Sequence, residues 1–275
     1  MLQKLKARWM RRDIRARGGR PLAGVVPYED ITPELRAAGI RVRPWTVDAT
    51  GVADYVQKAG YASLPYYDRG AAPNAYEKYL EHYLSMRLLA PTEGDVLVDI
   101  ACMDSPFSEI VAELYGLSTY RQDITYPAGI RDRMIGGDAA TMPVPDGFAD
   151  HLVMHCSFEH FEGDSDIRFV REASRVLRPG GRLCILPLYT SQQYAIQTHP
   201  RGLRAQRIEF ERGDTVYVSD EWGPPHQRYY DTDAFLRRIV EELGDLELTI
   251  YRITNLEDLQ GGCYLRFAAL LRKPA

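Results

Sequence analysis

The sequence lacks several patterns that would identify a chain at once. Its four cysteines lie far apart without a CxxC pair, which argues against a disulfide framework or a zinc knuckle and indicates reduced, mostly buried thiols. No run approaches the roughly eighteen apolar residues of a membrane-spanning helix, and the N-terminus lacks the apolar core of a secretory signal. The G-x-G-x-x-G fingerprint is missing, which argues against a nicotinamide dinucleotide site. We therefore expect a cytoplasmic protein.

The charge of the chain is unevenly distributed. With 45% hydrophobic and 26% charged residues, the 275-residue chain can bury the core of one large or two small domains. Residues 1–20 contain eight Lys and Arg side chains against Asp13 alone, so this segment carries +7 and the remainder −11. Two interpretations stay open: a basic helix peripheral to the inner face of the membrane or on another polyanion, or a solvated tail. The acidic remainder argues against nucleic acid as the partner.

Residues 21–91 form an N-terminal extension in the sequence pattern. Prolines interrupt the stretch 21–70, in which the sequence predicts one short helix over 33–38 with Thr32 as its N-cap. Residues 75–89 place apolar and aromatic side chains at the spacing of one helical face, which predicts a helix. We expect this extension to contribute a lid to the domain at 92–275.

From residue 92 onward, strands alternate with helices. The sequence predicts strands at 95–101, 118–124, 133–136, 151–156 and 182–187, helices at 105–115, 164–177 and 231–243, and a final antiparallel pair at 246–253 and 262–272. Apolar strands between helices are typical of a parallel sheet covered on both faces. The expected fold is α/β, a seven-stranded, mostly parallel Rossmann-like sheet with helices on both faces and an insertion at 188–230.

Acidic and imidazole side chains follow the predicted strands. Asp99, Asp123 and Asp138 lie at or just after the first three strand ends, and the segment from His155 to His160 follows the fourth. Ligands of open α/β sheets bind beyond the carboxyl ends of the strands, where the strand order reverses. We therefore expect these side chains to converge on one crevice.

Four segments carry a resemblance to a known family. They are DVLVDIA at 95–101, YRQDI at 120–124, GGDAATMPVPDGFADHLVMHCSFEHF at 136–161 and EASRVLRPGGRLCILPLY at 172–189. In this order and spacing the chain resembles, over about residues 92–190, the class I S-adenosylmethionine-dependent methyltransferases of the small-molecule type. The resemblance implies a Rossmann-like fold, S-adenosylmethionine as cofactor and methyl transfer as the activity.

The resemblance also implies roles for individual residues. Asp123 matches the acidic residue that accepts hydrogen bonds from the two ribose hydroxyls, a task suited to an acceptor-only carboxylate. Asp138 and Ala139 match the pair beside the adenine, and Asp99 matches the acidic position of the first motif. His155 opens the stretch 155–157 that passes the amino-acid tail of the cofactor.

The first loop departs from the family pattern. The family usually reads DIGCGTG there, whereas this chain has Ala101, Met103 and Ser105 in place of the glycines that let the backbone approach the cofactor. Three interpretations stay open. The cofactor is slightly shifted, the side chains of Asp104 and Ser105 contact its methionine amine and carboxylate, or the site has lost the cofactor.

Glu159 and His160 lie where the acceptor should approach. An imidazole titrates near neutrality, so His160 or His155 is our predicted general base, with Glu159 beside them; the methyl transfer itself needs mainly in-line positioning. No metal is expected, because His151 and His155 would lie about 13 Å apart on one strand face.

The predicted function is S-adenosylmethionine-dependent methyl transfer to a hydroxyl of a small molecule or glycan. Tyrosines clustered within 61–83 and 189–230 either pack in the core or line the acceptor pocket. The alternative is a methyltransferase-fold binding protein without catalysis that docks through its basic N-terminus. An RNA methyltransferase is less favoured, because the body of the chain is acidic.

Overall fold

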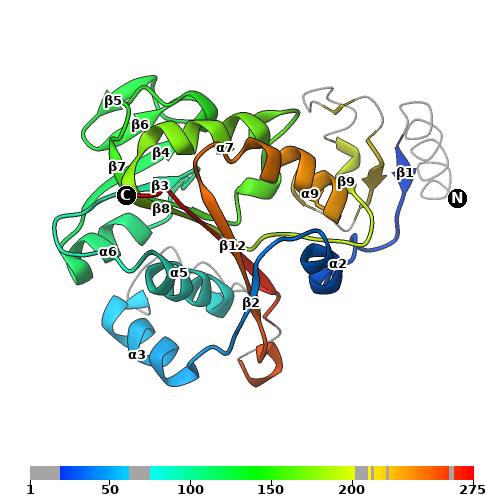
Figure 1. Cartoon of the computed structure of the whole chain (residues 1–275), viewed down its shortest axis with the longest axis horizontal. Coiled ribbons are helices and arrows are strands. Elements are labelled where there is room, and N and C mark those ends of the chain that lie inside the picture. Colours follow the sequence, from blue (N-terminus) through cyan, green and yellow to red (C-terminus); the bar gives the residue numbers. More distant parts are fainter. Residues whose placement is uncertain (1–18, 62–74, 202–209, 212–213, 221–222, 260–262) are drawn as a thin grey trace, which may run out of the picture.

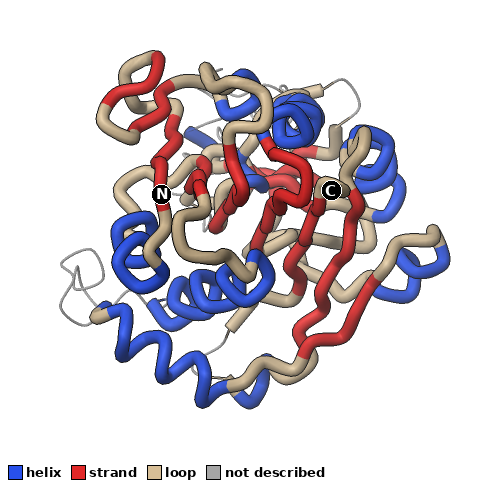
Figure 2. The backbone as a smooth tube through the Cα atoms, turned by 60° about the vertical axis from the view of Figure 1, so that its left-hand side comes forward, coloured by secondary structure: helices blue, strands red, loops and turns tan. Residues whose placement is uncertain are grey.

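The computed structural model describes residues 19–61, 75–201, 210–211, 214–220, 223–259 and 263–275. Figure 1 shows a large twisted sheet at the centre of the molecule with helices packed around it, and the tube of Figure 2 shows its strands lying side by side. Within the described residues no helix is long and apolar enough to cross a membrane.

The central sheet contains nine strands. Their spatial order is β2 (Val42–Trp45), β12 (Glu247–Ile253), β13 (Phe267–Arg272), β8 (Leu177–Leu186), β7 (Ala149–His155), β3 (Val96–Ile100), β4 (Ser118–Asp123), β6 (Met134–Gly136) and β5 (Gly129–Arg131). Strand β13 runs antiparallel to both of its neighbours, β5 runs antiparallel to β6, and the other pairs are parallel. The predicted α/β class and the final antiparallel pair are confirmed.

The predicted count of seven strands is wrong by two. Strand β2, from the N-terminal extension, pairs in parallel with β12, and β5 folds back on β6 as a hairpin. Both additions cover edge strands, whose N–H and C=O groups would otherwise be unpaired. The central seven strands therefore correspond to the prediction, and the two extra strands extend the sheet at its margins.

Five of the six helices named here lie close to the predicted ranges, whereas the sequence does not predict α3. The helices are α2 (Thr32–Ala37), α3 (Ala49–Ala59), α5 (Ala75–Leu89), α6 (Phe107–Tyr115), α7 (Ser165–Val176) and α9 (Thr232–Arg238), with single 3-10 turns η2 (Ala139–Thr141), η3 (Phe158–His160), η4 (Val240–Glu242) and η5 (Leu256–Asp258). The predicted N-cap of α2 is wrong. Thr32 is the first helical residue, and its N–H bonds to the Asp30 carboxylate instead.

Alternating side chains of the strands build a core on each face of the sheet. In β7, Leu152 and Met154 pack on the α7 side, whereas Val153 packs on the side of α5 and α6. The same alternation holds in β3 for Val98 and Leu97. The period-two pattern of a parallel strand buried on both sides thus fixes the layers that hold the strand ends in place.

The insertion at 188–230 contributes to a second, smaller sheet that the sequence does not predict. Its order is β1 (Arg20–Pro21), β10 (Val216–Val218), β9 (Ala195–Thr198) and β11 (Gln227–Tyr229). These strands have two to four residues each, too few for a hydrophobic alternation to show. The basic segment 1–20 lies outside the described residues, apart from its last two positions.

Candidate active site

A cavity of about 610 Å³ lies at the carboxyl ends of the central strands. Strand β3 has β4 on one side and β7 on the other, so the strand order reverses there. The lining residues come from the segments that follow β3, β4, β6 and β7: Ala101, Met103, Gln122, Asp123, Ile124, Thr125, Asp138, Ala139, Cys156, Ser157, His160, Phe161, Glu162, Ser165 and Arg168. Both the position and the size are typical of a small-molecule site.

Five of the predicted site residues line this cavity. They are Ala101, Asp123, Asp138, Ala139 and His160. Residues from four separate strand ends are therefore brought together, as the position of each after its strand predicts.

The other five predicted residues lie behind or beside the lining. Asp99, His155 and Glu159 are inside the fold, and Asp104 is exposed. The Ser105 hydroxyl accepts a hydrogen bond from the Phe107 N–H at the start of α6. The hypothesis that Asp104 and Ser105 contact a ligand through their side chains therefore has no support from the lining.

The loop after β3 keeps a backbone that glycine usually adopts. Ala101 has φ 52° and Met103 has φ 47°, both in the left-handed region. A residue with a Cβ pays about 1–2 kcal/mol there, and such strain concentrates at functional sites. This loop therefore makes left-handed turns at two residues that are not glycine.

Asp123 ends β4 and is almost fully buried. One of its oxygens accepts a hydrogen bond from the Met103 N–H at 2.9 Å, and the other accepts two from Thr125, through its N–H at 2.8 Å and its hydroxyl at 2.7 Å. A carboxylate offers about four acceptor positions, so about one remains for a ligand. Asp123 thus joins the β3 loop to the wall of the cavity.

Asp138 caps the 3-10 turn that follows β6. One oxygen accepts a hydrogen bond from the Ala140 N–H at 2.9 Å, and the other pairs with Arg168 of α7 at 3.0 Å. These two contacts fix the carboxylate at the edge of the cavity, with Ala139 beside it.

Asp99 is a buried carboxyl group beneath the β3 loop. Its Oδ2 has no hydrogen-bond partner among the described residues, and its Oδ1 lies 3.8 Å from the Nδ1 of His155. Burial raises the pKa of Asp99 to about 8, although the charge of Arg121 acts in the opposite direction. A buried carboxyl with a strongly shifted pKa beside a cavity is typical of a functional site.

We expect Asp99→Asn to stabilise the protein in alkaline buffer. The raised folded-state pKa means that this carboxyl favours the fold at acid pH and loses that contribution between about pH 4 and pH 8. The variant should therefore be only about 1–2 kcal/mol more stable than wild type at pH 5 and roughly 4–6 kcal/mol more stable at pH 9. Thermal unfolding at both pH values, with the exposed Asp104→Asn as control, checks this. An equal shift at both pH values would contradict it.

His155, at the end of β7, is buried away from the cavity. Its Nε2 lies 3.0 Å from the Ser85 hydroxyl, and its ring packs against His82 and Phe107 with centroids 4.7 and 4.5 Å away. Burial lowers the pKa of His155 well below its usual value, so the ring is neutral. His155 therefore lacks access to a ligand, and its predicted role as general base has no support in this geometry.

His160 and Glu159 follow β7 in a 3-10 turn. The His160 Nδ1 lies 2.5 Å from the carbonyl oxygen of His226, so this nitrogen donates and Nε2 is left as the basic nitrogen. The Nε2 lies 3.7 Å from the Oε1 of Glu159. Glu159 is buried, its Oε2 has no partner among the described residues, and burial raises its pKa. The Glu159 carboxyl thus lies within ion-pair distance of the His160 ring.

Cys156 connects the cavity to a polar cluster on α5. Its backbone is left-handed, with φ 48°, and its thiol lies 3.1 Å from the Oε1 of Glu81 and 3.5 Å from the Tyr264 hydroxyl. Lys78 pairs with Glu81 at 2.9 Å. Sequence reasoning missed this cluster, because its residues lie in the extension, after β7 and near the C-terminus. The buried polar positions of α5 were the one available signal.

Sequence reasoning also missed three side chains that hold the β3 loop. The Gln122 amide accepts a hydrogen bond from the Ala101 N–H at 3.2 Å and donates to the Gly137 carbonyl at 2.6 Å. Arg121 and Tyr126 both donate to the Met103 carbonyl. The absence of glycine in this loop was the signal that something else must hold it.

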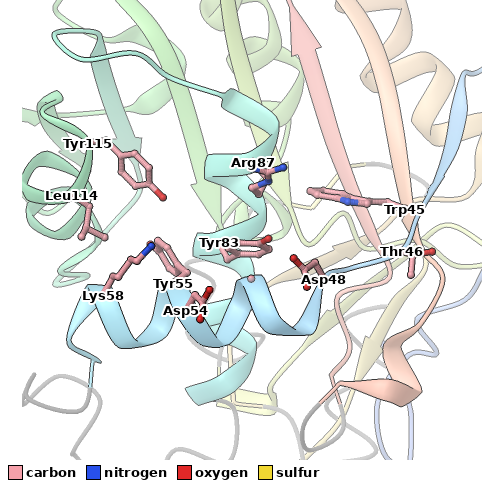
Figure 3. Close-up of a pocket in the computed structure, with 11 residues that line it drawn as sticks. Trp45, Thr46, Asp48, Asp54, Tyr55, Lys58, Tyr83, Arg87, Leu114 and Tyr115 are labelled. Atoms are coloured by element: carbon pink, nitrogen blue, oxygen red, sulfur yellow. The ribbon is translucent and has the colours of Figure 1, made fainter.

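A second cavity, of about 620 Å³, lies among α3, α5 and α6 (Figure 3). It is lined by charged and aromatic side chains, including Asp54, Lys58, Tyr83, Arg87 and Tyr115. The three charged groups among these are exposed, and no predicted site residue lines this cavity. The segments after β3, β4, β6 and β7 supply no lining residue to it, so the first cavity is the better candidate for chemistry.

Comparison with known proteins agrees with this choice. Residues 98–185, which include most of the strands and loops around the first cavity, match the family described as "Methyltransferase domain". The resemblance to methyltransferases seen in the sequence is thus confirmed over residues 98–185. None of the curated proteins compared with the chain matches it.

One solved methyltransferase structure shares the fold of this chain, and two others are similar to parts of it. The 1,6-didemethyltoxoflavin-N1-methyltransferase of Burkholderia thailandensis is 12% identical, with a TM-score of 0.51 over 86% of this chain and 94% of that one. The YcgJ protein of Bacillus subtilis is 19% identical, with a TM-score of 0.36 over 41% of this chain and 52% of that one. A methyltransferase from an antibiotic biosynthesis pathway of Anabaena variabilis is 22% identical, with a TM-score of 0.33 over 38% and 43%. The chain thus spans about half the length of the last two.

Proposed function

We propose that the methyltransferase domain binds S-adenosylmethionine in the cavity at the strand ends and methylates a hydroxyl of a small molecule or glycan. The observation that carries the proposal is the left-handed backbone at Ala101 and Met103. Both residues adopt a backbone that favours glycine although neither is glycine, and they do so at the edge of a ligand-sized cavity, which supports a loop that approaches a ligand.

The residues present fit the cofactor. Asp123 has about one acceptor position left, which suits a ribose hydroxyl, and Asp138 with Ala139 lines the cavity wall that we assign to the adenine. The unpartnered Oδ2 of Asp99 lies under the loop that would pass the methionine end. We propose that these residues hold the cofactor, with the backbone of the Ala101–Met103 loop against it.

S-adenosylmethionine supplies, when bound, an electrophilic methyl group that a nucleophile can attack in line. His160 faces the cavity and, with its Nδ1 held by the His226 carbonyl, can take the hydroxyl proton on Nε2. Glu159 then stabilises the resulting imidazolium, because its carboxyl lies 3.7 Å away and has an unpartnered oxygen. We propose His160 as the base, Glu159 as a positioning residue, and a structural role for His155.

The test uses methyl-labelled S-adenosylmethionine with the small-molecule fraction of a cell extract. We expect label in small molecules with wild type, and at least about a tenfold loss with His160→Ala, whose binding of S-adenosylhomocysteine should stay within about threefold of wild type. Phe161→Leu, the next residue of the same cavity wall, is the matched control for local packing. Cofactor binding without label in any fraction would favour the alternative, a binding protein without catalysis.

A further inference from the structure

We propose that Arg121, Asp123 and Tyr126 form a clamp on the backbone of Met103, which supplies the loop conformation that glycine supplies elsewhere in the family. The inference rests on the proposed function, because this loop borders the cavity assigned to S-adenosylmethionine. It assigns a positioning role to two side chains, Arg121 and Tyr126, that are not part of the cavity lining.

The clamp uses both backbone polar groups of Met103. The Met103 N–H donates to the Oδ2 of Asp123 at 2.9 Å. Its carbonyl accepts two hydrogen bonds of 2.6 Å, one from the Nη2 of Arg121 and one from the Tyr126 hydroxyl. Three side chains at and just after the end of β4 therefore hold a single left-handed residue from both sides.

Packing of the Met103 side chain cannot explain its backbone conformation. This side chain is 64% exposed, one of the most exposed large apolar groups in the described part of the chain. A residue with a Cβ avoids the left-handed region unless its surroundings over-determine it. The three hydrogen bonds are what the structure offers to impose the turn at Met103.

The clamp residues also hold one another. The Arg121 guanidinium lies over the Tyr126 ring, 5.8 Å from its centroid, and contacts the Oε1 of Glu109 in α6 at 3.3 Å. The Tyr126 hydroxyl also lies 3.5 Å from the thiol of Cys102, the residue before Met103. These contacts fix the donors before any ligand arrives, as expected of a preorganised loop.

The proposal predicts that glycine at position 103 makes the clamp dispensable. Glycine adopts the left-handed conformation at little cost, so in the Met103→Gly background the clamp should add little to the affinity for S-adenosylhomocysteine. Tyr126→Phe removes one hydroxyl and keeps the ring. It should weaken binding about tenfold when Met103 is present and less than about threefold when it is combined with Met103→Gly. Arg121→Lys, which loses the guanidinium fork, should behave in the same way.

The experiment compares wild type, Tyr126→Phe, Met103→Gly and the double variant in a double-mutant cycle. Calorimetric titration measures the affinity of each protein for S-adenosylhomocysteine, and urea unfolding measures its free energy of unfolding. Tyr120→Phe is the matched control, since its ring packs on Phe148 and under Arg133, in β4 but outside the clamp. Its affinity should equal that of wild type.

Two results would overturn the clamp. One is an equal loss of affinity from Tyr126→Phe in both backgrounds, and the other is no loss in either. If wild type fails to bind S-adenosylhomocysteine, the proposed function fails, and the unfolding data still decide the clamp. Tyr126→Phe must then lower the free energy of unfolding more in the wild-type background than in the Met103→Gly background. Equal changes would refute it.

Discussion

Asp123→Ala should weaken the binding of S-adenosylhomocysteine about 100-fold. The carboxylate presents its remaining acceptor position to the cavity, and a hydrogen bond to a charged group contributes about 1.5–3 kcal/mol. Its loss also frees the Met103 N–H and Thr125, so the cavity wall loses two of its fixed segments. Titration calorimetry with the ligand measures the change directly.

The controls for Asp123 separate charge from position. Asp104→Ala removes an exposed carboxylate from the same loop and should leave the affinity within about threefold. Asp123→Asn keeps the shape of the side chain but lacks the charge, so we expect an intermediate affinity. If Asp123→Ala and Asp104→Ala bind the ligand equally well, Asp123 has no part in recognition.

Asp166→Asn should cause the largest loss of stability of any substitution considered. Asp166 in α7 is fully buried and pairs with two buried guanidinium groups, Arg228 and Arg238, at 2.7 Å each. It also accepts a hydrogen bond from the Tyr230 hydroxyl at 2.7 Å. Removing this charge leaves two buried cations around an uncharged amide, which typically costs about 3–5 kcal/mol.

The thermal midpoint of Asp166→Asn should accordingly fall by roughly 6–20 °C. Asp164→Asn is the matched control, because Asp164 lies two residues away with its side chain 57% exposed and pairs with Arg168 at 2.9 Å. That substitution should change stability by less than about 1 kcal/mol. If the thermal midpoint falls equally in the two variants, the buried ion pairs of Asp166 contribute no more to stability than the exposed pair of Asp164.

The effect of Asp166 also has a defined pH dependence. Burial acts to raise the pKa of Asp166, but the hydrogen bond from Arg238 and the charges of Arg228 and Arg238 lower it below its usual value. A lowered folded-state pKa gives stability that is present above about pH 4 and is lost as the pH falls through the lowered value. The difference in the free energy of unfolding between wild type and Asp166→Asn should therefore become smaller at acid pH.

The sequence predicts the elements whose signal is local. The predicted helix over 75–89 is α5 itself, and the apolar run 95–101 contains β3. The helix predicted over 164–177 is α7, which ends at Val176, but the strand predicted over 182–187 starts earlier and includes Pro179, Gly180 and Gly181. Strand β8 begins at Leu177 and continues through these residues, because Gly180 takes φ 82° and its N–H bonds to the C-terminal segment.

Elements held by distant partners escape sequence reasoning. Strand β1 pairs with β10 and β2 pairs with β12, and each pair joins opposite ends of the chain. Strands of two to four residues are too short to show a hydrophobic periodicity, so the local sequence does not predict them. Their position depends on the edges that the larger sheet leaves open.

The candidate site likewise contains residues that the sequence predicts and residues that it does not. Asp123, Asp138 and His160 were predicted from their place after strands, and they line the cavity. Arg121 and Tyr126 were missed because they act on the Met103 carbonyl, and a sequence gives no sign of contacts made to backbone atoms. His155 does not line the cavity, and its position at the end of β7 does not reveal that its ring packs against His82 and Phe107.

The most direct test of a working cofactor site in this glycine-free loop is titration of the wild-type protein with S-adenosylhomocysteine and S-adenosylmethionine. We predict saturable binding to a single site with a Kd of about 1–100 μM for both ligands. No heat and no shift of the thermal midpoint at about 1 mM ligand would contradict it, and would mean that Ala101, Met103 and Ser105 have closed the site to the cofactor.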